Sequence, residues 1–204
     1  MKRTLIHRAA LSIPTLFDSL LAGATLYDSS CSPEARVIYL EKDGGYYLKS
    51  AEKGTLAKEA KMTAYFHGKG MGAEVLAYES LERDWLLTAR VRGEDCTHSD
   101  YLADPARLCD LLAQQLRALH EQDFSDCPVP NRSEAYFATA ERNYRQGAYD
   151  LSYCADERGI ATADDAWRTV EEGRGLLCAD TLIHGGYCLP NIMLDDWRFS
   201  GFID

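Results

Sequence analysis

The order of the secondary-structure signals constrains the fold of this chain more than any other feature of its sequence. Segments rich in β-branched and aromatic residues come first, as two pairs within residues 36–49 and 73–91, and a short helix is expected between them over residues 55–67. Residues 105–120 carry leucines at three- and four-residue spacing behind a proline, which predicts a long amphipathic helix. Strands followed by helices favour an α+β fold with two lobes.

Further helices and a terminal hairpin are expected after the long helix. The helices are predicted over residues 133–144 and 163–172, with Ser133 and Thr162 as their N-caps. Two apolar runs flank a turn-like Asp-Asp-Trp-Arg segment within residues 192–204, which predicts a short hairpin. The helical part of the chain therefore ends in a pair of strands.

A break in the pattern at Gly93-Glu94-Asp95 separates the strands from the helices. We therefore expect a small antiparallel sheet lobe over residues 1–91. Residues 92–204 are expected to form a mainly helical lobe that ends with the hairpin.

Composition narrows the classes of partner and cellular location. The chain has 22 Lys and Arg against 32 Asp and Glu, a formal net charge of −10, which argues against a nucleic acid or an anionic membrane as partner. No apolar run approaches the ~20 residues of a membrane helix, so the cytoplasm is the expected location. Seven scattered cysteines without a Cys-x-x-Cys pair indicate reduced, mostly buried thiols rather than disulfides or a zinc site.

The terminal hairpin presents two oxygen-bearing side chains at its ends. Asn191 precedes the first apolar run and Asp204 follows the second. An Asn and an Asp held together at strand ends are ligands that share Mg²⁺ with nucleotide phosphates in kinases. The hairpin therefore predicts a site for phosphoryl transfer.

The sequence around this hairpin resembles the signature of the aminoglycoside phosphotransferase family. That signature is His-Gly-Asp-x-x-x-x-Asn followed by Gly-Phe-Ile-Asp, and residues 184–191 read His-Gly-Gly-Tyr-Cys-Leu-Pro-Asn while residues 201–204 read Gly-Phe-Ile-Asp. Gly186 stands where the family has the Asp that accepts the proton of the substrate hydroxyl. The chain also stops at Asp204, whereas members of the family continue into further helices. The resemblance implies a protein-kinase-like two-lobe fold, incomplete at the C-terminus, in which the lobe of residues 1–91 would bind the nucleotide.

The resemblance assigns roles in the catalytic loop and at the phosphates of ATP. His184 is expected to brace the loop rather than transfer protons, and Asn191 and Asp204 are expected to bind Mg²⁺. Lys49, on a strand, and Glu59, on the following helix, would orient the phosphates of ATP.

A serine-bearing turn resembles the family's phosphate-covering loop. No Gly-x-Gly-x-x-Gly is present before residue 36, and Ser30 or Ser32 would donate to a phosphate oxygen. The alternative reading is an ordinary polar turn, since Ser and Pro are standard turn residues.

Two further segments correspond to binding regions of the family. The backbone groups of Ala89 and Val91 would hold the nucleobase. Asp156 and Glu157 would contact the amines of the drug. A core strand is the alternative for the first segment, and a solvated loop is the alternative for the second.

By this resemblance the chain is an ATP-dependent aminoglycoside O-phosphotransferase that modifies kanamycin- or neomycin-like antibiotics and confers resistance. Gly186 and the end at residue 204 are expected to impair its activity. One alternative is a catalytically dead kinase-like fragment that at most binds nucleotide, and another is a kinase of a different small hydroxylated substrate. The sequence leaves the oligomeric state open.

Overall fold

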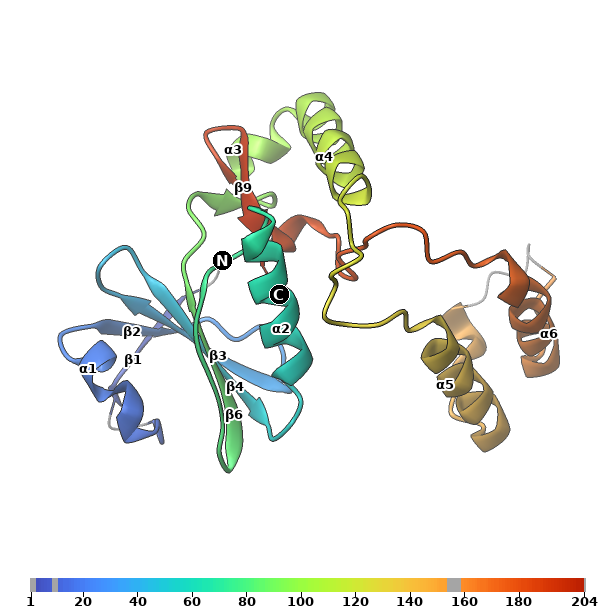
Figure 1. Cartoon of the computed structure of the whole chain (residues 1–204), viewed down its shortest axis with the longest axis horizontal. Coiled ribbons are helices and arrows are strands. Elements are labelled where there is room, and N and C mark those ends of the chain that lie inside the picture. The colour runs from blue at the N-terminus through green and yellow to red at the C-terminus, as the bar shows by residue number, and fades with distance from the viewer. Residues whose placement is uncertain (1–2, 9–10, 154–158, 204) are drawn as a thin grey trace. The chain divides into compact units, whose positions relative to one another are not determined.

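The computed structural model describes residues 3–8, 11–153 and 159–203 of the chain (Figure 1). The chain divides into two compact units. The first comprises Met1–Glu121, Ser125–Val129 and Ile183–Asp204, and the second comprises Gln122–Phe124 and Pro130–Leu182. The lobe boundary expected near residue 91 lies inside the first unit, and it stays a prediction.

The first unit is built on a six-stranded antiparallel sheet with the strand order β1-β2-β3-β4-β6-β5. The two strand pairs expected from the sequence are present as the hairpins β3-β4 and β5-β6. Two short N-terminal strands, β1 and β2, extend the edge of the sheet and were not predicted. The strands are β1 Thr4–Ile6, β2 Thr25–Asp28, β3 Ala35–Glu41, β4 Tyr46–Glu52, β5 Val75–Ser80 and β6 Arg83–Ala89.

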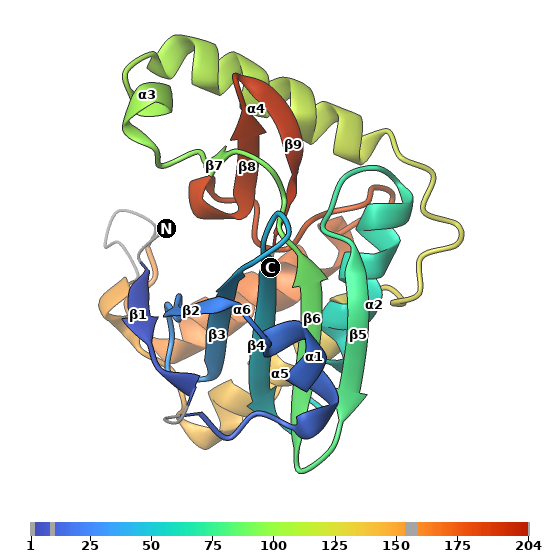
Figure 2. The same ribbon diagram turned by 90° about the vertical axis from the view of Figure 1, so that its left-hand side faces the viewer.

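Apolar side chains cover both faces of this sheet, because successive residues of each strand point to opposite faces. One face packs against the 3-10 turn η2 (Thr15–Phe17) and the short helix α1 (Asp18–Leu21), and the other face packs against α2 (Ala57–Gly68), so the two helices lie on opposite sides (Figures 1 and 2). Each fully buried leucine contributes roughly 1.5–3 kcal/mol. The first cluster comprises Phe17, Leu21, Leu26, Ile38, Leu40, Leu48, Trp85 and Leu87, and the second comprises Ala51, Leu56, Ala60 and Leu86.

A second, three-stranded sheet holds the terminal hairpin in the order β7-β8-β9. The predicted hairpin is confirmed, and β7 joins its first strand. Gly93 precedes β7 with φ +84°, and a Cβ there would lie 1.9 Å from the carbonyl oxygen of Leu194, so only glycine fits. The strands are β7 Glu94–Asp95, β8 Ile192–Asp195 and β9 Arg198–Phe202.

The long amphipathic helix is present as α4, Pro105–His120, after the short helix α3, Ser99–Leu102. The side chain of Asp104 caps α4 by accepting a hydrogen bond from the backbone N–H of Arg107 at 3.1 Å. Proline follows at the first helical position, as expected.

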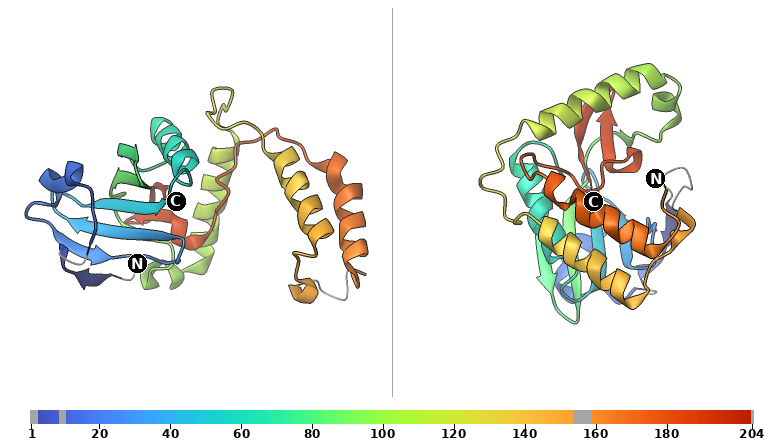
Figure 3. Two further views of the ribbon diagram at one scale, coloured as in Figure 1. Left: turned by 90° about the horizontal axis from the view of Figure 1, so that it is seen from below. Right: turned by 90° about the vertical axis from the view of Figure 1, so that its right-hand side faces the viewer.

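The second unit contains a pair of helices that lie side by side, α5 (Ser133–Gln146) and α6 (Ala163–Gly173) (Figure 3). The rings of Tyr144 and Trp167 stack between them, with centroids 5.3 Å apart and planes within 8°. Short 3-10 turns follow each helix, η3 at Leu151–Tyr153 and η5 at Arg174–Leu176.

One of the two expected N-caps in this unit is confirmed and the other is wrong. Thr162 caps α6 in a reciprocal capping box with Asp165. The N-cap of α5 is Arg132, and Ser133 instead donates its backbone N–H and its hydroxyl to the side chain of Asn131. Asn131 thus accepts the first free backbone N–H of the helix, and the side chain of the N-cap residue itself makes no capping hydrogen bond.

The cysteines differ from expectation in their exposure. Among the described residues all six cysteines are free, but only Cys96 is buried and Cys127 is half-buried. The prediction of mostly buried thiols is therefore wrong. The exposed cysteines are Cys31, Cys109, Cys178 and Cys188.

No helix in the described ranges is long and apolar enough to cross a membrane.

Candidate functional site

Lys49 and Glu59 form an ion pair between the sheet and α2. The ammonium Nζ of Lys49 lies 2.9 Å from both carboxylate oxygens of Glu59. The two side chains are 19% and 23% exposed, so the pair is partly screened from water and its geometry is bidentate. The structure thus brings the two predicted phosphate-orienting residues together, while their role stays a prediction.

A buried carboxylate that the sequence analysis missed holds the start of α2. Asp84 is fully buried, and it accepts hydrogen bonds from the backbone N–H of Leu56 at 2.9 Å and from the hydroxyl of Ser80 at 2.7 Å. Burial raises the pKa of Asp84, but hydrogen bonds from the Gly54 backbone, Ser80 and Leu56 outweigh burial and lower that pKa to about 2. Because Glu59 lies in the first turn of α2, Asp84 fixes the segment that carries Glu59. The only sequence signal was an acidic residue at the start of an apolar strand.

The serine-bearing turn contacts β3 at Val37, the residue that pairs with Lys49 of β4. The hydroxyl oxygen of Ser30 accepts a hydrogen bond from the backbone N–H of Val37 at 2.9 Å, and Val37 pairs directly with Lys49 across β3 and β4. Ser32 lies in the same exposed turn, where its hydroxyl lowers the pKa of Glu34. The turn therefore brings Ser30 toward the predicted phosphate position, and Ser32 lies toward its tip.

The segment that joins the two sheets contains Ala89 and Val91. The backbone N–H of Ala89 donates to the carbonyl oxygen of Glu74 at 2.9 Å. The side chain of Val91 is buried in one cluster with Ala73, which precedes β5, and Met193, which lies on β8. The packing holds this segment in place, as backbone recognition of a base requires, but that role stays a prediction.

The loop before β8 folds around the carbonyl group of Gly186. This oxygen accepts hydrogen bonds from the backbone N–H of Cys188 at 2.8 Å and from the side-chain Nδ2 of Asn191 at 3.1 Å. The backbone N–H of Ile203 donates to the carbonyl oxygen of Asn191 at 3.0 Å. Asn191 therefore lies beside the residue that precedes Asp204. Asp204 itself lies outside the described residues.

The structure has room for a side chain at position 186. A Cβ there would lie 3.2 Å from Nδ2 of Asn191 and 3.9 Å from Nδ1 of His184, and φ of Gly186 lies outside the left-handed region that favours glycine. The closer contact is the end of a side chain, which can move by a few tenths of an ångström. Position 186 can therefore accept an aspartate without backbone strain.

His184 belongs to an aromatic cluster that connects α2 with β9. Its ring centroid lies 5.6 Å from that of Phe66 on α2 and 4.8 Å from that of Phe202 on β9. Phe66 and Phe202 also contact each other at 6.1 Å. The ring of His184 is thus packed between α2 and β9, while its bracing role stays a prediction.

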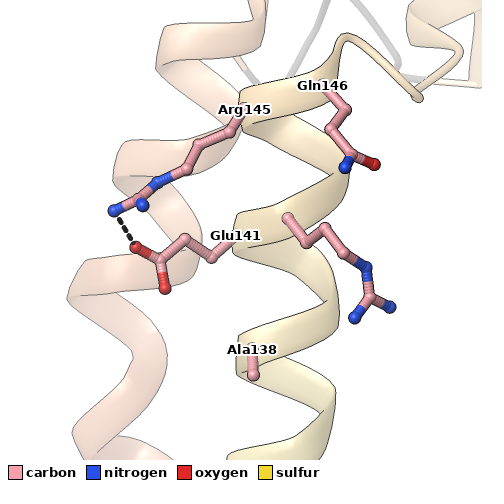
Figure 4. Close-up of a pocket in the computed structure, with 5 residues that line it drawn as sticks. Ala138, Glu141, Arg145 and Gln146 are labelled. Carbon is pink, nitrogen blue, oxygen red and sulfur yellow. Dashed lines mark hydrogen bonds and ion pairs between the residues drawn. The ribbon is translucent and has the colours of Figure 1, made fainter.

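The predicted drug-binding residues Asp156 and Glu157 lie outside the described residues. A shallow pocket in the second unit lies on α5 and is drawn in Figure 4. None of the residues predicted for the site lines this pocket. Its lining residues are Ala138, Glu141, Arg142, Arg145 and Gln146, with an ion pair between Glu141 and Arg145.

Asn191, the one predicted ligand within the described residues, has the chemistry to share a magnesium ion with phosphates. Asn191 directs its amide nitrogen to Gly186, which leaves its carbonyl oxygen, a hard ligand of the kind Mg²⁺ takes, directed elsewhere. Within residues 3–8, 11–153 and 159–203 no group of three or more His, Cys, Asp or Glu side chains gathers to bind a metal. A site of one or two protein ligands completed by phosphates needs no such group.

Comparison with known proteins matches most of the chain to one family. The family model described as the phosphotransferase enzyme family matches residues 33–204. A Lactococcus lactis protein named "Probable aminoglycoside 3'-phosphotransferase" is 45% identical over 192 residues, which are 94% of this chain and 73% of that protein. The aminoglycoside 3'-phosphotransferase of Niallia circulans is 28% identical over 74% of this chain and 57% of its own length.

Solved structures of such enzymes share the fold. The crystal structure of an aminoglycoside-3'-phosphotransferase of type VIII matches with a TM-score of 0.69 and 25% identity, over 92% of this chain and 75% of that chain. The Streptomyces rimosus enzyme APH(3'')-Id, solved with ADP and streptomycin, matches with a TM-score of 0.68 and 22% identity, over 94% of this chain and 76% of that chain. The expected kinase-like α+β fold is confirmed.

Proposed function

The chain belongs to the phosphotransferase enzyme family, and from this premise we propose that it binds ATP with Mg²⁺ and transfers the γ-phosphoryl group to a hydroxyl of an aminoglycoside. The Lactococcus and Niallia relatives, both named as aminoglycoside 3'-phosphotransferases, support the substrate class. The Streptomyces rimosus neighbour supports the nucleotide, because it was solved with ADP as well as streptomycin.

The observation that carries the proposal is the placement of Asn191 at the end of the hairpin. The hydrogen bond from Ile203 to Asn191 continues the β8-β9 ladder by one residue, so the two strand ends lie side by side. This is the arrangement in which a catalytic-loop Asn and a strand-end Asp meet. Asn191 and Asp204 would hold Mg²⁺ there. A bound Mg²⁺ would neutralise charge on the phosphates during transfer.

Lys49 and Glu59 are proposed to place the phosphates. Lys49 lies on β4, one of the two central strands of the sheet, and its contact with both carboxylate oxygens of Glu59 fixes the position of its ammonium group. A phosphate oxygen approaching Nζ would meet a charge that is already oriented, which lowers the ordering cost of binding. Ser30, beside Val37, would contribute at the edge of the same region.

Gly186 determines how fast the proposed reaction runs. A positioned general base typically contributes about 10²–10⁴-fold to the rate. Phosphoryl transfer depends mostly on positioning and electrostatics through a loose transition state. We therefore propose slow turnover, in which the hydroxyl of the acceptor loses its proton to water rather than to a side chain at position 186.

The glycine also favours a second candidate function, which is nucleotide binding without turnover. The groups that would hold ATP do not depend on a side chain at position 186, since Lys49 and Glu59 lie on β4 and α2. A protein with this site would bind ADP and ATP alike and release no product. Turnover assays separate this candidate from the first.

The test is the release of ADP by the full chain in the presence of Mg²⁺-ATP and kanamycin, with choline and ethanolamine as alternative acceptors. We expect slow release that depends on kanamycin. Release that depends on choline or ethanolamine instead would contradict the proposed substrate class. Tight binding of ATP with no release above background would favour the second candidate.

A further inference from the structure

A row of tyrosines crosses the sheet on the face that carries Lys49. Tyr27, Tyr39 and Tyr47 are direct neighbours in the register of β2, β3 and β4. Their ring centroids are spaced by 6.1 Å and 5.1 Å. Lys49 follows Tyr47 by two residues on β4, so both side chains point to the same face.

Arg3 brings a positive charge onto this row from the edge of the sheet. Its guanidinium carbon lies 3.6 Å from the centroid of the Tyr39 ring, and its Nη2 donates a hydrogen bond to the hydroxyl of Tyr47 at 3.1 Å. Strand β1, which follows Arg3 directly, pairs with β2, so the side chain of Arg3 reaches across β2 and β3 to touch β4. A guanidinium over an aromatic ring makes a cation–π contact.

The position of Tyr47 along β4 places this contact at one end of the proposed nucleotide site. Tyr47 pairs with Thr88 and Tyr46 pairs with Ala89, the residue at which β6 enters the connection between the two sheets. Lys49 pairs with Leu86, farther from that connection. If Lys49 holds the phosphates and the backbone near Ala89 holds the base, Tyr47 lies at the end of the site that would bind the nucleoside part of the nucleotide.

We propose that Arg3 is a positioning residue for the nucleoside end of the nucleotide site, and that it acts by fixing the side chain of Tyr47. The inference rests on the proposed nucleotide binding. Arg3 touches Tyr47 at the hydroxyl, the tip of the ring, and covers the ring of Tyr39, which is only 4% exposed. The guanidinium therefore lies beside the nucleoside position and restrains the side chain that borders it. A restrained aromatic side chain loses less entropy when a ligand packs on it.

The experiment measures the dissociation constants of ADP and ATP by calorimetry for the full chain and four variants. Arg3→Ala removes the guanidinium group. Tyr47→Phe removes only the hydroxyl group that accepts the hydrogen bond from Arg3, and the third variant combines the two substitutions. Arg36→Ala is the matched control, because Arg36 lies on β3 between Ala35 and Val37 and so points to the opposite face. Thermal unfolding without nucleotide checks that all variants fold, which we expect since Arg3 is exposed.

We expect Arg3→Ala and Tyr47→Phe each to weaken ADP binding by roughly 3–10-fold. The double variant should bind ADP no more weakly than Arg3→Ala alone, because Arg3→Ala already removes the hydrogen bond that Tyr47→Phe removes. The loss of affinity in Arg3→Ala should be equal for ADP and ATP. Arg36→Ala should bind both nucleotides with the affinity of the unaltered chain.

Three results would overturn the inference while leaving the proposed function intact. The first is unchanged or tighter binding of ADP by Arg3→Ala. The second is a double variant whose loss of binding free energy equals the sum of the two single losses. The third is a loss of affinity in Arg3→Ala that is larger for ATP than for ADP, which would place the guanidinium at the phosphates. Failure of the unaltered chain to bind either nucleotide would instead refute the proposed function and the inference with it.

Discussion

The side-chain Nδ2 of Asn191 donates a hydrogen bond to the carbonyl oxygen of Gly186 at 3.1 Å. This contact ties the proposed magnesium ligand to the position from which the family's base is absent. It also fixes the orientation of the amide, since nitrogen and oxygen of the same group point in different directions. The loop therefore holds the amide of Asn191 in one orientation although residue 186 has no side chain.

Asn191→Ala should remove the effect of magnesium on nucleotide binding. The variant loses both the amide oxygen and the hydrogen bond to Gly186, and the lost hydrogen bond should cost about 1 kcal/mol of folding stability. Calorimetric titration of ADP with Mg²⁺ and with a chelator measures the effect. We expect Mg²⁺ to tighten binding to the unaltered chain and to change binding to the variant far less. An equal gain from Mg²⁺ in both proteins would show that Asn191 is not a ligand.

Lys49→Ala should weaken ATP binding about tenfold or more, the scale of a lost hydrogen bond to a charged group. The variant also leaves the carboxylate of Glu59 facing the phosphates without its cation. Lys58→Ala is the matched control, because Lys58 is an exposed lysine next to Glu59 on α2. Equal affinities of the two variants for ATP would refute the assigned role of Lys49.

Asp84→Asn should destabilise the first unit by about 2 kcal/mol at neutral pH, because a buried carboxylate loses charge-assisted hydrogen bonds. The folded-state pKa of about 2 lies below the ordinary value of 3.8. The stabilisation by Asp84 is therefore complete above about pH 4 and is lost as the pH falls towards about 2. Urea unfolding of the unaltered chain and of Asp84→Asn at several pH values measures this difference in the free energy of unfolding. A stability difference between the two proteins that stays constant down to pH 2 would contradict this account.

Much of the fold followed from local patterns. The hairpins β3-β4, β5-β6 and β8-β9 and the helix α4 were predicted because each has its own periodicity, turn residues and flanking apolar runs. The strands β1 and β2 were missed because each has only three or four residues, and β1 pairs with β2 across residues 7–24 of the chain.

The candidate site was predictable where it rests on motifs and not where it rests on distant contacts. The ion pair of Lys49 with Glu59 and the position of Asn191 beside the end of β9 agree with the expected pattern. The buried carboxylate of Asp84 and the contact of Arg3 with Tyr47 join residues 28 to 44 positions apart. Such contacts depend on strand order, which propensity and periodicity do not encode.

In the proposed function this chain is an aminoglycoside kinase that the glycine at position 186 slows. A Cβ at position 186 would come closest to the end of the Asn191 side chain, at 3.2 Å, and a small shift of that side chain relieves the contact. We therefore expect Gly186→Asp to fold and to place a carboxylate in the loop. The matched control is Gly185→Asp, which puts the same side chain at the adjacent position, in a left-handed conformation of φ +87°.

The most direct measurement is kanamycin-dependent release of ADP by the unaltered chain and by Gly186→Asp, assayed together with saturating Mg²⁺-ATP. We expect Gly186→Asp to turn over about 10²–10⁴-fold faster than the unaltered chain, whereas Gly185→Asp should gain nothing. Equal rates in the unaltered chain and in Gly186→Asp, with both proteins folded and binding ATP, would contradict the claim that the missing carboxylate limits the reaction.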